Sequence, residues 1–440
     1  MVKNLSVNIL CIFLLFLNPL AAQELHLNKV DSLLRNLEVN NKAIGSVSIF
    51  KSGKEVYNRS FGQKNIDKLK LDKNYIYQVG SITKLVTSVL VFKLIDNNKL
   101  SLETKLSSFF PEIPNANVIT IKNLLNHTSG LADYVFKDGN EVWLKQKVSH
   151  QEILNEIIKQ GILFQPNESV KYSNSAYYLL ARIVEKLYDM DYNKIIQKEI
   201  SKPLKLKNFS SYVQKNKNVL KSYFYDEEWK ELKDFDFSNV IGVGDISSTM
   251  QDLNVFINNL FNGKLITKHS LELMKPCSAD SRYYGLGMYK IPFKDCIFIG
   301  HGGDTYGTHT LLGYNIEQDL SISLALNGTV ISYNDFYIAV VDNLFGKSFD
   351  FVFNSFMKVD EKELEIYNGI YSNRELPLDL SIFVENGVLK AQATDQEAVR
   401  LDCYEKDKFL NEANGIKIHF EINKNKLTLF QHDEIVEFLK

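Results

Sequence analysis

The chain has 440 residues, of which 45% are hydrophobic and 24% are charged, and its formal net charge is −2. At roughly 150 residues per domain, this length predicts two or three domains. The near balance of positive and negative charges argues against sequence-independent binding to nucleic-acid phosphates, which needs a basic surface. The 28 Phe and 22 Tyr residues supply ample surface to bury, so we expect a folded globular protein with no nucleic-acid partner.

The N-terminal segment, residues 1–22, is predicted to be a signal peptide rather than part of the fold. Lys3 precedes an apolar run at residues 9–17, and small residues follow for cleavage near Ala22. The run has the length of a signal-peptide core, whereas a membrane-spanning helix would need about 20 apolar residues. We therefore expect an exported protein, periplasmic or extracellular, without an integral membrane anchor. Cys11 lies inside the apolar run, which disfavours a lipoprotein.

Three cysteines remain after such a cleavage, namely Cys277, Cys296 and Cys403. Export would permit disulfides, but an odd number leaves at least one thiol unpaired. A Cys277–Cys296 bridge and three buried free thiols are both open alternatives. No pair has the Cys-x-x-Cys spacing, so neither a redox motif nor a zinc site is indicated.

The chain up to residue 348 mixes helical and strand patterns without a regular alternation. A helix is predicted over 30–37, and a hairpin over 46–50 and 55–60. The strongest helical pattern covers 81–95, and further helices are expected near 121–125, 151–159, 175–187, 249–260 and 335–345. Strand patterns occupy 284–289, 296–299, 308–314 and 320–325. We predict one α+β domain over 23–348, whose antiparallel sheet takes strands from both ends and is flanked by a helical block.

Past residue 350 the pattern changes to short alternating runs separated by turns. The predicted strands are 378–384, 388–391, 417–422, 426–430 and 435–439. Their spacing is typical of a small sandwich or barrel. Residues 363–440 are therefore predicted to form an antiparallel β domain, joined through a linker at 349–362.

Gly80-Ser81-Ile82-Thr83-Lys84 opens the strongest predicted helix. A spacing of three residues places Ser81 and Lys84 on one face of a helix, one turn apart. Backbone N–H groups at the helix N-terminus favour developing negative charge, and an apolar surround would lower the pKa of Lys84 so that it could take the serine proton. Alone, the pattern is also that of an ordinary serine N-cap.

Two further segments supply polar groups for a cleft. Tyr172-Ser173-Asn174 lies directly before the predicted helix at 175–187, where the Tyr hydroxyl and the Asn amide can both face a cleft. His301-Gly302-Gly303 follows the predicted strand at 296–299. Its glycines allow a backbone to approach a ligand closely.

Together and in this order, the three segments resemble the motifs of the penicillin-recognising serine hydrolases, in the branch of class C β-lactamases, D,D-peptidases and related esterases. Tyr-x-Asn and His-x-Gly stand in for the two partner motifs of Ser-x-x-Lys. The segments 124–131 and 244–252 also resemble family segments. For these we expect structural roles, with His127 holding a turn and Asp252 capping a helix together with Thr249.

The resemblance implies a mechanism without a metal or cofactor. Ser81 would be the nucleophile that attacks an ester, amide or lactam carbonyl, and Lys84 and Tyr172 would share the acid and base work. Either could abstract the serine proton, although Tyr172 would then need a pKa well below its usual value of about 10. The backbone N–H groups of Ser81 and Asp304, the residue after Gly303, would form the oxyanion hole.

Two residues of this implied site bear on the substrate. His301 stands where class C β-lactamases carry lysine, and the resemblance implies a pH-sensitive donor there; Asp304 replaces a small hydroxyl residue. A mostly neutral imidazole holds a carboxylate less strongly than an ammonium does. We therefore expect a peptide or ester hydrolase rather than an efficient β-lactamase, with Asn174 orienting a substrate amide. The substrate would be a small molecule or a peptide, for which peptidoglycan is one source.

The start of the C-terminal region, Tyr367-Asn368-Gly369-Ile370-Tyr371, resembles that of the lipocalin-like modules appended to such hydrolases. One alternative function is a non-catalytic peptidoglycan- or peptide-binding protein on the same scaffold. The intact Ser81, Lys84 and Tyr172 argue against it. A metallohydrolase is a more distant alternative, because the eight His residues show no His-Glu-x-x-His spacing.

Overall fold

The computed structural model describes residues 24–66, 75–212, 219–276, 284–349 and 351–440, the last range with gaps at 352, 354–355, 358, 374–377, 395, 413 and 432–433. The predicted signal peptide and Cys277 lie outside the described residues. Cys296 and Cys403 are free thiols. None of the helices in the described ranges is long and apolar enough to cross a membrane.

The larger sheet has eight strands, and its main path runs in the order β2-β1-β10-β9-β8-β7. All neighbours on this path are antiparallel, and the N-terminal hairpin lies beside the later strands, as predicted. A hairpin of β4 and β5 joins through one parallel bridge between Tyr223 and Gly328. The strands are β1 Ala43–Lys51, β2 Lys54–Phe61, β4 Ser222–Asp226, β5 Glu228–Leu232, β7 Tyr289–Phe293, β8 Cys296–Asp304, β9 His309–Asn315 and β10 Leu320–Thr329, with β3 Tyr77–Gln78 and β6 Ser247–Ser248 paired apart from them.

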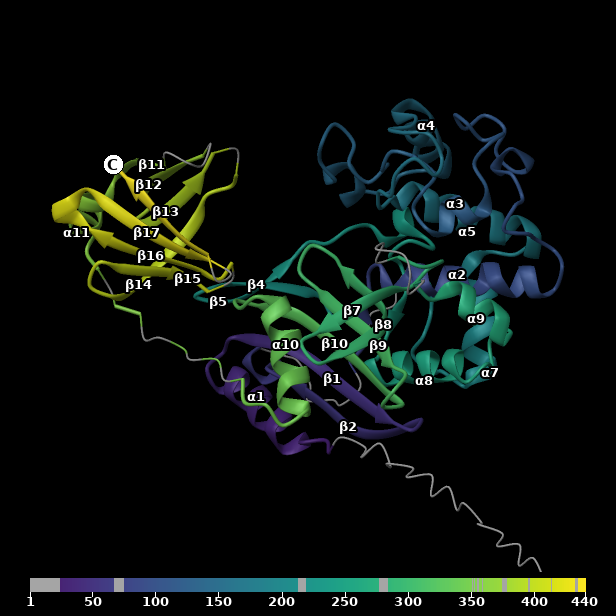
Figure 1. The fold of residues 1–440 in the computed structure, drawn as a ribbon, viewed down its shortest axis with the longest axis horizontal. Coiled ribbons are helices and arrows are strands. Elements are labelled where there is room, and N and C mark those ends of the chain that lie inside the picture. Colours follow the sequence, from purple (N-terminus) through teal and green to yellow (C-terminus); the bar gives the residue numbers. More distant parts are fainter. Residues whose placement is uncertain are drawn as a thin grey trace, which may run out of the picture.

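Helices cover both faces of this sheet (Figure 1). Successive strand side chains point to opposite faces, so neighbouring residues enter different cores. Leu311 packs in the cluster under α1 (Leu27–Val39) and α10 (Tyr333–Leu344), whereas Leu312 packs in the cluster that holds α2 (Ile82–Asp96) and α8 (Met250–Phe261). The second, larger cluster also contains the helical block. Its remaining helices are α3 Ile121–Leu125, α4 His150–Gln160, α5 Asn174–Tyr188, α6 Tyr192–Ile196, α7 Lys202–Leu204 and α9 Lys268–Met274.

One predicted strand, 284–289, is wrong for most of its length. The strand begins only at Tyr289. Before it the chain makes a turn, in which the Gly285 N–H donates to the Met288 carbonyl at 2.7 Å and Gly287 has a φ of +107°. Glycine permits that conformation at little cost, so the alternating apolar pattern does not decide the structure here.

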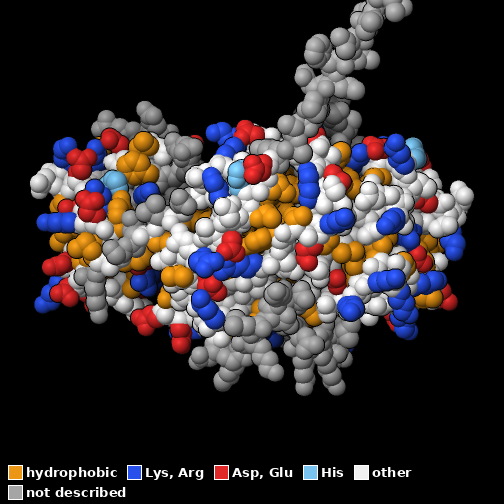
Figure 2. Space-filling model, turned by 90° about the horizontal axis from the view of Figure 1, so that it is seen from below, with side chains coloured by type: hydrophobic (Ala, Val, Ile, Leu, Met, Phe, Trp, Pro, Cys, Tyr) orange, Lys and Arg blue, Asp and Glu red, His pale blue; other side chains and the backbone are white. Residues whose placement is uncertain are grey.

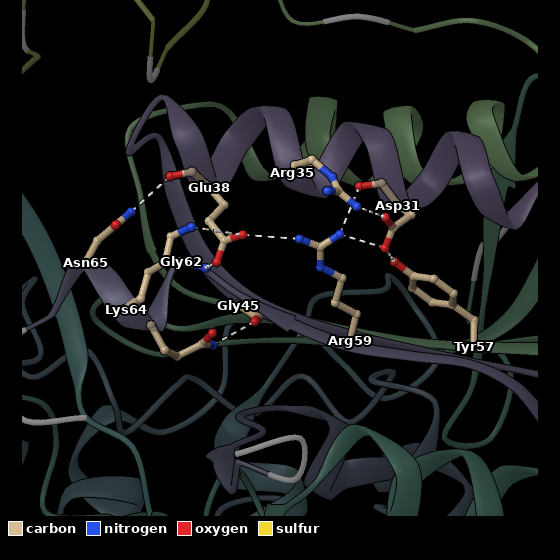
Figure 3. A network of polar contacts seen from close by, with 10 residues as sticks. Asp31, Arg35, Glu38, Gly45, Tyr57, Arg59, Gly62, Lys64 and Asn65 are labelled. Atoms are coloured by element: carbon tan, nitrogen blue, oxygen red, sulfur yellow. Dashed lines mark hydrogen bonds and ion pairs between the residues drawn. The ribbon is translucent and has the colours of Figure 1, made fainter. Parts of the chain in front are cut away.

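The N-terminal helix is held to the edge of the sheet by a network of charged groups (Figure 3). Arg59 on β2 pairs with Asp31 at 2.6 Å and with Glu38 at 3.1 Å, both on α1. Glu38 also accepts a hydrogen bond from the Gly62 N–H at 3.2 Å. On the face drawn in Figure 2, charged side chains of both signs are interspersed, in keeping with the small net charge of −2.

The C-terminal region forms a closed antiparallel barrel, in which each strand pairs with its neighbours in the chain. A bridge between Ser372 and Leu439 closes it. Buried side chains, including Tyr371, Phe409 and Phe420, fill its interior. The order is that of an up-and-down barrel, the architecture of lipocalins. The short α11 Glu361–Leu364 leads into the strands β11 Gly369–Ser372, β12 Asp379–Glu385, β13 Val388–Ala393, β14 Val399–Glu405, β15 Lys408–Asn411, β16 Ile416–Glu421, β17 Lys426–Gln431 and β18 Glu434–Leu439.

Candidate active site

The predicted site residues meet at the N-terminus of α2. The end of β8 and the start of β9 lie directly against the residues that precede this helix. The Thr310 hydroxyl on β9 donates to the Val79 carbonyl at 2.9 Å. A Cβ atom on Gly80, whose φ is +53°, would lie 2.7 Å from the Asp304 nitrogen, and one on Gly303 would clash with the Val79 carbonyl. Glycine at both positions therefore brings the backbones of Ser81 and Asp304 together.

Ser81 and Lys84 lie on one face of α2, as their spacing predicts. The Lys84 Nζ donates to the Ser81 Oγ at 2.9 Å and to the Val243 carbonyl at 2.9 Å. Twelve residues of α2 are buried and Lys84 is among them, so the amine is shielded from water. Burial lowers the pKa of Lys84 to about 7, although the charge of Asp133 opposes the shift. A substantial fraction of the amine is therefore neutral near pH 7.

Tyr172 lies over the same amine, with its ring centroid 4.9 Å from the Lys84 Nζ. Its ring also packs against His127, at 4.5 Å between centroids. Burial raises the pKa of the Tyr172 hydroxyl well above its usual value, and a hydrogen bond with Ser81 offsets only part of the rise. The lowered pKa that a Tyr172 base would need is therefore not found, because the desolvation of a phenolate outweighs the hydrogen bond with Ser81.

His127 and its turn hold the Tyr172 segment in place. His127 is buried with a φ of +61°. Its Nδ1 accepts a hydrogen bond from the Ser173 N–H at 3.2 Å, and its carbonyl accepts one from the Lys171 N–H at 3.0 Å. These contacts give His127 the structural role that we expected.

Asp133 belongs to the site but was not predicted from the sequence. Its carboxylate accepts hydrogen bonds from the Asn174 side chain at 2.9 Å and from the Asn174 N–H at 3.2 Å. Burial raises the pKa of the Asp133 carboxyl, against the effect of these hydrogen bonds and of Lys84. The motif at 124–131 ends two residues before Asp133, and the sequence contains no sign that Asp133 and Asn174 are paired.

His301 is buried on β8, with its ring 4.8 Å from that of Tyr289. The N–H of Gly302, the residue after His301, donates a hydrogen bond to the Tyr289 hydroxyl at 2.5 Å. Burial lowers the pKa of His301 to about 3, and the charge of Lys84 contributes to the shift. The expectation of a pH-sensitive donor is therefore wrong, because a buried imidazolium lacks the solvation that would keep it charged at pH 5–8.

The Asp304 carboxylate is exposed and bonds to the His309 Nδ1 at 2.6 Å, across the β8–β9 pair. His309 in turn stacks on Tyr333, with 4.3 Å between ring centroids. Ser81 opens into a cavity of about 230 Å³. Its walls are formed by Gly80, Ser81, Val135, Phe136, Glu141, Asn174, Phe235, Phe237, Val240, Val243, Gly244, Asp304 and Thr305.

A buried carboxylate, Asp245, fixes the turn that accepts the second Lys84 hydrogen bond. Asp245 accepts from the Gly242 N–H at 2.7 Å and from the Tyr212 N–H at 3.0 Å, and it also bonds to the Ser211 hydroxyl. The Val243 carbonyl lies within this turn. Asp245 is therefore a positioning residue for Lys84, and the sequence pattern alone did not reveal it.

Of the predicted capping arrangement of Thr249 and Asp252, only the hydrogen bond to the Thr249 side chain is formed. The Thr249 hydroxyl accepts from the Asp252 N–H at 3.1 Å and caps α8. The Asp252 carboxylate instead accepts from the Asn208 N–H at 2.8 Å. Within the described ranges, no group of three or more His, Cys, Asp or Glu side chains is placed to hold a metal ion.

At this site a buried lysine forms a hydrogen bond with a serine at a helix N-terminus, beside an antiparallel sheet. This arrangement is that of a serine-hydrolase-like protein related to the penicillin-recognising enzymes. The model of the family described as "Beta-lactamase" matches residues 30–337, and the chain belongs to this family.

Known relatives agree with this membership. A penicillin-binding protein of Bacillus subtilis (strain 168) is 26% identical over 403 residues, which cover 85% of this chain and 86% of that protein. The teichoic acid D-alanine hydrolase of Staphylococcus aureus (strain MRSA252) is 26% identical over 321 residues, covering 71% and 72%.

Solved structures agree in fold. The octameric penicillin-binding protein homologue from Pyrococcus abyssi has a TM-score of 0.64 at 21% identity and covers 93% of this chain and 99% of its own. A D-amino acid amidase from Ochrobactrum anthropi SV3, complexed with L-phenylalanine amide, has a TM-score of 0.63 at 21% identity, covering 72% and 97%.

Proposed function

We propose that the protein is an exported serine hydrolase that forms an acyl-enzyme on Ser81. One observation carries this proposal: the Nζ of a fully buried lysine, Lys84, lies 2.9 Å from the Ser81 Oγ. Burial lowers the pKa of that lysine to about 7, which suits a general base near neutral pH.

In this mechanism, neutral Lys84 accepts the Ser81 proton while the Oγ attacks the substrate carbonyl. The backbone N–H groups of Ser81 and Asp304 stabilise the oxyanion as the carbonyl becomes tetrahedral. Tyr172 stays protonated, because its pKa is raised. It donates its proton to the leaving group as the bond to that group breaks, and is reprotonated from the Lys84 ammonium. Water then attacks the acyl-enzyme carbonyl and gives a proton to neutral Lys84. As the bond between the acyl carbon and the Ser81 Oγ breaks, the Lys84 ammonium returns that proton to the Oγ.

The charges around Ser81 favour an amino-acyl ester or amide over a β-lactam. Among the described residues, the cavity is lined by two carboxylates, Glu141 and Asp304, and by no Lys or Arg. His301, with a pKa of about 3, is neutral and cannot replace an ammonium. An acyl group with a free ammonium is therefore favoured over one with a carboxylate, and in this proposal Asn174 orients it. The D-alanine hydrolase and D-amino acid amidase relatives support this substrate class.

We also propose a cellular location for the protein and a division of the chain into domains. Residues 1–22 would direct export to the periplasm or the extracellular space, and the relatives named for penicillin and teichoic acid support a cell-wall setting. Residues 23–348 would carry the reaction, and residues 363–440 would form a separate β domain.

Intact mass after incubation with a fluorophosphonate probe tests the nucleophile. The wild-type chain should gain one adduct, and Ser81→Ala should gain none. Ser88→Ala provides a matched control, since Ser88 is buried on the same helix, and should be labelled like the wild type. Equal labelling of Ser81→Ala and wild type would refute the proposal. A parallel panel of D-alanyl esters, D-alanyl amides and penicillin should show turnover of the first two.

A further inference from the structure

A hollow of about 390 Å³ lies at the end of β8, where residues of β7, β8, β9 and α10 line it. Asp304, the last residue of β8, lines both this hollow and the Ser81 cavity. The Ser81 cavity holds about 230 Å³, which is less than the roughly 300 Å³ at the lower end of typical ligand sites. It can therefore accept little more than a small acyl group, and a leaving group that passes Asp304 would enter the hollow.

The free edge of β8 gives access from one space to the other. The pairing of β7 with β8 ends at Gly300, and among the described residues no strand continues it along 302–304. Gly302 and Gly303 line the hollow and have no side chain to close this edge, as at other strand positions where a ligand approaches a backbone closely. A chain that leaves the Ser81 cavity can therefore cross β8 at this edge.

The charged side chain that faces this hollow is a carboxylate. Asp304 lies opposite His309 in the β8–β9 pair, and the His309 Nδ1–H donates to its carboxylate at 2.6 Å. His309 stacks on Tyr333 of α10, which places the carboxylate on the α10 face of the sheet. Lys290 also lines the hollow. Its neighbour Ile291 packs in the cluster under α10, so the Lys290 side chain points to the opposite face of the sheet.

Three tyrosines, Tyr289, Tyr333 and Tyr337, line the hollow as well. The Tyr289 hydroxyl is occupied by the hydrogen bond from the Gly302 N–H. Tyr337 is only 8% exposed, and within the described ranges its hydroxyl has no hydrogen-bond partner. A buried polar group without a partner is costly, so this hydroxyl favours a ligand that supplies a hydrogen bond.

The field at these tyrosines is negative. Burial, and next to it the charge of Asp304, raises the pKa of Tyr337 well above its usual value. The same two causes raise the pKa of Tyr333. Among the described residues, no cationic side chain offsets either rise. Both hydroxyls therefore stay protonated and present oxygen lone pairs beside a carboxylate.

From this arrangement we infer that the hollow is a subsite for a primary ammonium group at the end of an apolar leaving group. The inference rests on the proposed serine hydrolase and specifies the part of its substrate that departs. The ammonium would donate to the Asp304 carboxylate and to the Tyr337 hydroxyl, and it would lie against tyrosine rings, whose faces attract cations. An anionic end would be repelled by Asp304, and a purely apolar end would leave the Tyr337 hydroxyl without a partner.

The test compares two substrates of the full chain, the 5-aminopentyl amide and the hexyl amide of D-alanine. The two amides differ in one terminal group, which is an ammonium in the first and a methyl in the second. At low ionic strength, kcat/KM should be about three- to tenfold higher for the aminopentyl amide. The difference should shrink in high salt, because the charges are screened.

Three variants locate the preference. Asp304→Asn removes the charge and keeps the backbone N–H, and it should lower the ratio of the two kcat/KM values to about one. Tyr337→Phe keeps the ring and removes the hydroxyl, and it should lower the ratio about twofold. Asp342→Asn is the matched control. Asp342 is a carboxylate on α10 that faces Lys347 at 3.5 Å instead of the hollow, so the wild-type ratio should persist.

Two results would overturn the inference. One is equal kcat/KM for both amides, and the other is an ammonium preference that survives either Asp304→Asn or Tyr337→Phe unchanged. In both cases, cleavage of the two amides would leave the proposed hydrolase intact, whereas absence of Ser81 labelling would refute the hydrolase itself. Calorimetric titration with n-pentylamine gives a readout without turnover. Binding that is lost in Asp304→Asn and kept in Asp342→Asn supports the inference, and binding that is absent or insensitive to Asp304→Asn overturns it.

Discussion

The sheet-and-helix region and the C-terminal barrel bury different kinds of residues. The first region joins strands that are far apart in sequence, as in the pairing of β1 with β10, and it buries ionisable groups such as Lys84, His127 and Asp245. The barrel pairs each strand with its chain neighbours, and its described buried residues are all hydrophobic. Figure 1 shows the barrel to one side of the sheet. The difference indicates that long-range pairing builds the chemical site, whereas local pairing builds the barrel.

Replacing the buried lysine should have the largest effect on the chemistry. In Lys84→Met the general base is lost while the apolar volume is retained, so we expect the rate of Ser81 acylation by a fluorophosphonate to fall by about 10²- to 10⁴-fold. Stopped-flow or quenched labelling followed by mass spectrometry measures this rate. Thermal unfolding of the same variant provides the control for folding. A folded Lys84→Met protein that is acylated at the wild-type rate would remove Lys84 from the mechanism.

A core substitution in the barrel should produce the opposite pattern. Phe420 packs against Tyr367 at 4.6 Å and Phe409 at 5.7 Å between ring centroids. Phe420→Ala should lower the free energy of barrel unfolding by about 3–5 kcal/mol, because it leaves a cavity among these rings. Urea unfolding measures that loss, and Ser81 labelling should stay within about twofold of wild type. Ile435→Ala, at an exposed barrel position, is the control. Parallel loss of barrel stability and labelling would show that the two regions fold as one unit.

The pH dependence of acylation should report the burial of Lys84. The pKa of Lys84 is lowered to about 7, and only the neutral amine accepts a proton. The rate should therefore rise about tenfold from pH 6 to pH 8 and then level off. His301, with a pKa of about 3, stays neutral over this range. Asp133 raises the pKa of Lys84, so Asp133→Asn should move the midpoint to lower pH. A flat profile, or a midpoint near 10, would contradict a desolvated base.

The two regions also differ in what the sequence could predict. Local patterns located the helix of Ser81 and Lys84 and five of the barrel strands, since period and turn residues suffice there. They missed β11, β14 and β15 and the β4–β5 hairpin. At the site, motif spacing predicted the serine, its lysine and the partner segments, which the structure brings together, but it indicated neither Asp133 nor the contacts of Asp245. Their partners lie on other segments of the chain. The raised pKa of Tyr172 and the low pKa of His301 follow from burial, which spacing does not reveal.

The smallest predicted effect concerns the contact between the two regions. Lys42, beside β1, pairs with Glu412 of the barrel at 2.9 Å, and its Nζ lies 5.2 Å from the ring centroids of Phe353 and Phe356. The pair is more shielded than a typical surface ion pair, with both side chains 16% exposed. A double-mutant cycle of Lys42→Ala and Glu412→Ala should give a coupling of about 0.5–1 kcal/mol in barrel unfolding. Lys54→Ala, on the exposed start of β2, should show no coupling with Glu412→Ala. A coupling of zero for Lys42 would mean that this ion pair does not help to hold the barrel beside the sheet.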